Sequence, residues 1–147
     1  MKRLGLLIVC FATMAFSSCS VFQSAASSDP VATTAGRNCG IAVQGLYGTY
    51  RNTGTIDLTN ANNLNNALAL ATSYTALRQN KGNQAYRKAF TSGLIASSAG
   101  LITSANASAF IDKMLATSGL GNINTQTVTQ TAATAAAVIS LLNVLKQ

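Results

Sequence analysis

The side chains best able to do covalent or acid–base chemistry are three cysteines and three aspartates. They are Cys10, Cys19, Cys39, Asp29, Asp57 and Asp112. The 147 residues include no histidine and no glutamate, so the commonest general base and metal ligand is missing. A catalytic thiolate also needs an activating neighbour, and the acids are far apart in the sequence. We therefore expect a protein that is not an enzyme and has no metal or cofactor. An enzyme that depends on Cys39 alone remains as an alternative.

Four cations within eleven residues form the other chemically distinctive group, which we call the basic turn. Its members are Arg78, Lys81, Arg87 and Lys88. A short basic run is usually a solvated helix end, and two of these cations can also stabilise the negative pole of a preceding helix. The same cations could contact an anionic surface such as lipid headgroups or a glycolipid. Both interpretations stay open at this stage.

The N-terminal segment differs in composition from the rest of the chain. Lys2 and Arg3 precede an apolar run over residues 4–16, and small residues follow at 17–19. A basic start, a short apolar core and then small residues at a cleavage site are typical of a secretory signal peptide. The apolar run is shorter than the roughly 20 residues that a membrane-spanning helix needs. We expect residues 1–18 to be this signal.

The end of the apolar run, Phe16-Ser17-Ser18-Cys19, resembles the lipobox of bacterial lipoprotein precursors, with Phe16 where leucine is usual. The resemblance covers residues 1–19 only. It implies cleavage before Cys19, a diacylglycerol thioether on that cysteine and attachment to a membrane. Ser20 and the lack of acidic residues before Asp29 then favour an outer membrane location facing the periplasm.

The processing has alternatives. An ordinary signal peptidase could cut after Ala15 or near Ala26 and release a soluble protein. If Cys10 is removed with the signal peptide and Cys19 is lipidated, Cys39 is the remaining thiol. We favour the interpretation that Cys39 is a small buried hydrophobic side chain. Without lipidation, a Cys19–Cys39 disulfide would close a loop of about twenty residues and add ~3 kcal/mol. An extracytoplasmic location leaves an envelope protein or an anionic glycolipid as possible partners and disfavours nucleic acid.

Beyond Cys19 the composition predicts a flexible tether over residues 19–38 and a helical domain over residues 39–147. Residues 40–50 fit a glycine-containing helix or a strand, and we favour the helix. Apolar spacing of three and four residues predicts further helices over 59–80, 83–103, 106–118 and 127–146. The fold class is therefore all-α, a small bundle of four or five helices.

Particular residues define these expected helices. The first apolar stripe consists of Leu64, Leu68, Ala71, Tyr74 and Leu77, and Gly82 is expected to end that helix. The helix expected over 83–103 contains small residues at 89, 93, 96, 97 and 100. We expect them to let another helix of the bundle pack closely against it. Thr127 and Gln130 resemble a capping box for the last helix. Phe110, Ile111, Met114 and Leu115 are expected to face inward.

Together these features predict a membrane-anchored bacterial lipoprotein whose non-catalytic domain is a structural or interaction module of the cell envelope. A periplasmic carrier of small apolar molecules is the alternative.

The chain has 10 basic and 3 acidic residues. Removal of residues 1–18 takes Lys2 and Arg3 and leaves 8 basic against 3 acidic residues. Half of the remaining cations then belong to the basic turn.

Overall fold

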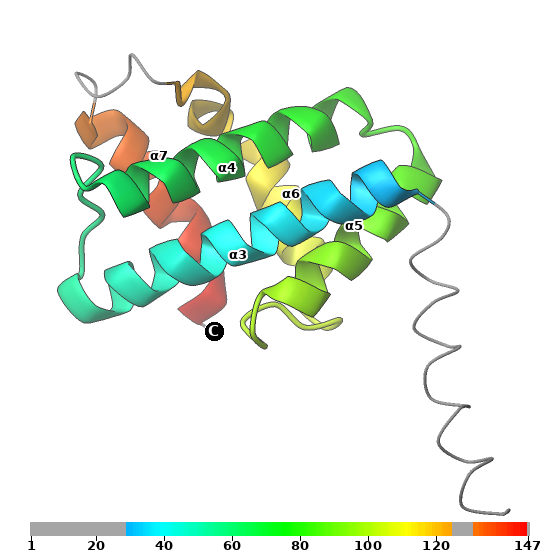
Figure 1. The fold of residues 1–147 in the computed structure, drawn as a ribbon, viewed down its shortest axis with the longest axis horizontal. Coiled ribbons are helices and arrows are strands. Elements are labelled where there is room, and N and C mark those ends of the chain that lie inside the picture. The colour runs from blue at the N-terminus through cyan, green and yellow to red at the C-terminus, as the bar shows by residue number, and fades with distance from the viewer. Residues whose placement is uncertain (1–28, 125–130, 147) are drawn as a thin grey trace, which may run out of the picture.

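The computed structural model describes residues 29–124 and 131–146 (Figure 1). These residues form five α-helices and two short 3-10 helices, without a strand, which confirms the all-α bundle. The elements are α3 (Pro30–Thr53), α4 (Ala61–Gln79), α5 (Gln84–Ser97), α6 (Ala107–Ala116), η1 (Ser118–Asn122), α7 (Thr131–Leu142) and η3 (Asn143–Lys146). The predicted signal peptide and Cys19 lie outside the described residues.

Helix α3 begins earlier than the composition suggested. The Asp29 carboxylate accepts a hydrogen bond of 2.9 Å from the Ala32 N–H, and Pro30 occupies the first turn. Aspartate at the N-cap and proline directly after it are both favourable helix-starting residues. The predicted tether is therefore wrong from residue 30 to residue 38, where the chain is helical. The preference for a helix over residues 40–50 is confirmed.

Helices α3 and α5 run parallel and touch through glycine. A Cβ atom on Gly36 would collide with the Phe90 carbonyl oxygen, and one on Gly93 would collide with the Thr33 carbonyl oxygen. The Ser97 hydroxyl lies 2.9 Å from the Arg37 carbonyl oxygen. The predicted close approach at 93 and 97 is confirmed, and its partner surface is the start of α3.

Helix α4 packs antiparallel on the other side of α3. The Ser73 hydroxyl lies 3.1 Å from the Ala35 carbonyl oxygen, and Thr49 contacts Asn63 near the far end of the pair. The predicted stripe of α4 is confirmed at Ala71, Tyr74 and Leu77, but the buried face is rotated near the start of the helix. Asn63 and Ser73 are buried, whereas Leu64 and Leu68 are only half-buried.

The ends of the two middle helices also differ from expectation. Helix α4 ends at Gln79 without a left-handed residue at Gly82, so the predicted glycine stop is wrong. Helix α5 ends at Ser97 instead of residue 103, because Ala99 (φ 50°) and Gly100 (φ 81°) are left-handed. The buried Ser98 hydroxyl stabilises this turn by accepting a hydrogen bond from the Ile102 N–H at 3.1 Å.

The C-terminal elements cover the rest of the core. Phe110, Ile111 and Met114 are buried as predicted, while Leu115 is half-buried. Instead of one helix over 127–146, α7 is followed by η3, and the predicted capping box at 127 and 130 lies outside the described residues. Figure 1 shows α6 and α7 behind the α3–α4 layer. The largest fully enclosed side chains include Phe90, Phe110, Leu46, Leu70 and Leu141.

Candidate functional site

Cys39 lies in the middle of the bundle and is fully buried. Its thiol Sγ is 4.0 Å from the Met114 Sδ, and burial raises its pKa from an ordinary 9.0 to about 12. Because the thiolate is the reactive form of cysteine, this side chain is a poor nucleophile. The prediction that Cys39 acts as a small buried hydrophobe is confirmed.

The three aspartates have separate local roles. Asp29 caps α3, and Asp112 pairs with a cation on α5. Asp57 accepts hydrogen bonds from the Thr59 hydroxyl at 2.7 Å and the Thr59 N–H at 2.9 Å, which lower its pKa. Since no two of these carboxylates interact, they do not form an acid–base pair. Within residues 29–124 and 131–146, no group of three or more histidine, cysteine or acidic side chains is arranged so that it could hold a metal ion.

The basic turn lies where α4 ends and α5 begins. Arg78 is in the last turn of α4, Lys81 is in the connecting loop, and Arg87 and Lys88 are in the first turns of α5. Arg78, Lys81 and Lys88 are exposed, and Arg87 is half-buried. The fold therefore keeps the four cations at one end of the bundle instead of spreading them over its surface.

Two of these cations have partners within the bundle. An Arg87 guanidinium nitrogen lies 3.5 Å from an Asp112 carboxylate oxygen, with the two side chains 39% and 66% exposed. At that exposure the pair adds little to stability. Arg78 donates a hydrogen bond of 3.3 Å to the Tyr74 hydroxyl and lies 6.0 Å from the centre of its ring. The remaining charges, Lys81 and Lys88, project from the surface.

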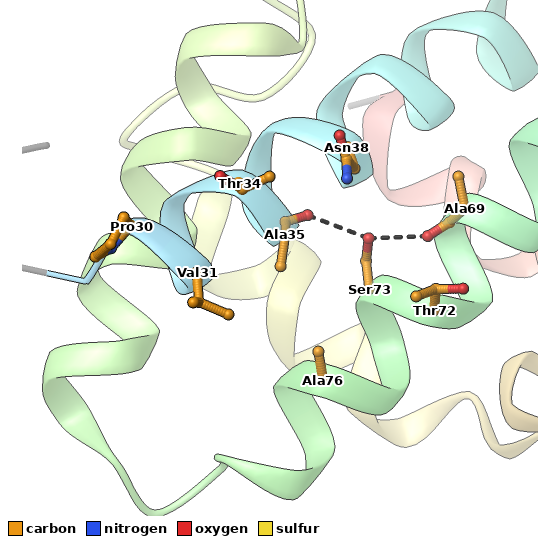
Figure 2. A pocket seen from close by; sticks show the side chains of 9 residues that line it. All are labelled: Pro30, Val31, Thr34, Ala35, Asn38, Ala69, Thr72, Ser73 and Ala76. Atoms are coloured by element: carbon orange, nitrogen blue, oxygen red, sulfur yellow. Dashed lines mark hydrogen bonds between the residues drawn. The ribbon is translucent and has the colours of Figure 1, made fainter.

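A surface groove of about 680 Å³ runs between α3 and α4. Figure 2 shows its walls, which are formed by Pro30, Val31, Thr34, Ala35, Asn38, Ala69, Thr72, Ser73 and Ala76. None of these side chains is charged. Val31 is 70% exposed, an unusual position for a large apolar residue in this fold. The Ser73 hydroxyl bonds to the Ala35 and Ala69 carbonyl oxygens, and most of the exposed surface of the groove is apolar.

A polar cluster at the opposite end of α3 was not predicted. The Tyr50 hydroxyl lies 3.1 Å from the Asn143 amide oxygen and accepts a hydrogen bond of 2.9 Å from the Lys146 ammonium group. The ammonium nitrogen is also 4.3 Å from the centre of the Tyr50 ring. These residues are more than 90 positions apart, so no local pattern could reveal the cluster. It attaches the C-terminal η3 to α3.

Comparisons with protein families, with curated proteins and with solved structures find no match. In the part of the chain that the structure describes, no helix is long and apolar enough to cross a membrane. The candidate site thus consists of an exposed basic turn, an uncharged groove and a buried, unreactive thiol.

Proposed function

We propose that this protein is a bacterial lipoprotein, attached to a membrane through Cys19, whose helical bundle is a non-catalytic structural or interaction module of the cell envelope. The lipobox-like segment at residues 16–19 carries the proposal. The favoured location is the outer membrane, with the bundle facing the periplasm. An envelope protein or an anionic glycolipid would be its partner.

The organisation of the domain is compatible with this proposal. Every residue of the described core lies between Ala32 and Leu142. Removal of residues 1–18 would therefore take away none of these core side chains. A processed chain would retain the described bundle and connect it to Cys19 through residues 20–28.

Membrane fractionation of the native host tests the anchor. We expect the protein in the membrane fraction, resistant to extraction by high salt, because acyl chains bind membranes through the hydrophobic effect. Cys19→Ala is the variant and Cys39→Ala is the matched control, since Cys39 is buried in the bundle. The proposal fails if both variants and the unaltered protein distribute in the same way.

The groove between α3 and α4 favours a second function, a carrier of small uncharged apolar molecules. Its walls lack charge and its volume of about 680 Å³ lies within the range of ligand sites. Val31→Asn would make the groove polar without altering the core. Native mass spectrometry of gently purified protein tests the idea. A bound apolar molecule lost in the variant supports a carrier, and a protein without such a molecule contradicts it.

A further inference from the structure

The basic turn and the start of the described chain lie at the same end of the bundle. Pro30 and Ala76 line one end of the groove, so the first turn of α3 is beside the last turns of α4. Burial raises the pKa of Tyr86, in the first turn of α5, and the negative charge of the nearby Asp29 carboxylate raises it further. Figure 1 shows the start of α3, the end of α4 and the start of α5 together. We call this the exit end.

The charge of the exit end is positive. The four cations of the basic turn are accompanied there by Asp29 and Asp112. Asp29 accepts a backbone hydrogen bond as a helix cap, and Asp112 offsets only Arg87. The third acid, Asp57, precedes α4 and so lies at the opposite end of the bundle. An anionic partner would meet the exposed Arg78, Lys81 and Lys88 first.

The length of the connection limits how far this end can lie from the membrane if Cys19 carries the anchor. The ten peptide steps from Cys19 to Asp29 span at most about 36 Å. Helix α3, with 24 residues, is itself about 36 Å long. The exit end is therefore held within about 36 Å of the anchor, whereas the Tyr50 end can lie up to a helix length further away.

We propose that the basic turn at the exit end docks on anionic phospholipid headgroups and orients the bundle with α3 pointing away from the bilayer. This inference rests on the proposed anchor at Cys19. Each Lys or Arg close to an anionic membrane strengthens binding about fivefold, and the effect extends over roughly one Debye length. The anchor holds the protein at the membrane, and the basic turn selects which end faces it.

A vesicle experiment tests the orientation without relying on natural lipidation. The chain from residue 19 onward is coupled through the Cys19 thiol to a maleimide lipid, and the buried Cys39 does not compete. The vesicles contain phosphatidylcholine alone or mixed with phosphatidylglycerol. An uncharged amine-reactive acetylating reagent then labels lysines, and mass spectrometry measures the rate at each position. Lys146, bonded to Tyr50 at the far end of α3, is the internal control.

Docking predicts that phosphatidylglycerol slows labelling of Lys81 and Lys88 by about two- to fivefold relative to Lys146. High salt should remove the difference. Arg78→Ser, which removes one charge from the exit end, should weaken this protection, whereas Arg51→Ser, with the same charge change at the opposite end, should not. Equal labelling in both vesicles, or equal effects of the two variants, overturns the proposal. Because the coupling is synthetic, either result is independent of whether the native chain is lipidated.

Discussion

At the scale of single residues, environment decides what each reactive group can do. Cys39 is surrounded by apolar side chains beside Met114, and a charged thiolate is costly there. Lys81 and Lys88 are exposed, so a partner can reach their ammonium groups. Cys39 is therefore poorly placed for nucleophilic attack, whereas Lys81 and Lys88 are placed for electrostatic contact at the surface.

Thiol labelling checks the first part of this account. In the chain from residue 19 with Cys19→Ser, we expect Cys39 to remain unmodified by a thiol reagent at neutral pH while the protein is folded. Denaturant should expose it and give one thiol per chain. Rapid labelling under native conditions would show that the α3–α6 contact opens easily, contrary to the structure.

The raised pKa of Cys39 also predicts a pH dependence. The unfolded thiol ionises near pH 9, whereas the folded thiol keeps its proton until about pH 12. The stability associated with this difference is complete below pH 9 and is lost as the pH rises towards 12. In urea unfolding of the same chain, the free energy of unfolding should fall above pH 9 by up to about 1.4 kcal/mol per pH unit. The free energy of unfolding of the Cys39→Ala variant should fall less steeply above pH 9. Identical slopes for the two proteins would contradict the burial of the Cys39 thiol.

At the scale of elements, α3 organises the fold because both neighbours bind to its backbone. Ser73 on α4 and Ser97 on α5 place hydroxyl groups at α3 carbonyl oxygens, and glycine permits the contact with α5. The sequence predicted the α5 half of this contact from its small residues. It missed the α3 half, because Gly36 was assigned to a tether rich in small polar residues. The signal was present in Asp29-Pro30, a cap followed by a helix-starting proline.

Glycine substitutions test the importance of this contact. Gly36→Ala and Gly93→Ala should each lower the free energy of unfolding by about 1–3 kcal/mol, because the added Cβ meets backbone carbonyl groups that cannot move independently. Gly48→Ala is the matched control. Gly48 is also in α3, but nothing lies within 4 Å of its added Cβ, so alanine should stabilise by about 0.5–1 kcal/mol. Urea unfolding measures all three, and equal effects would contradict the packing.

At the scale of the whole molecule, composition and periodicity predicted an all-α bundle, the buried Cys39 and the position of the basic turn. The features that were missed depend on distant residues. Helix α4 contacts both α3 and η1, and Tyr50 near the end of α3 contacts Lys146 in η3. The proximity of the basic turn to the start of α3 likewise follows from the parallel packing of α3 and α5.

The central claim is that the bundle is attached to a membrane through Cys19. Its most direct test is the intact mass of the protein extracted from the membranes of its native host. We predict a chain that begins at residue 19 and carries diacylglycerol on that cysteine, and we predict that Cys19→Ala abolishes this species. An unmodified chain that begins at another residue and is recovered from the soluble fraction would contradict the claim.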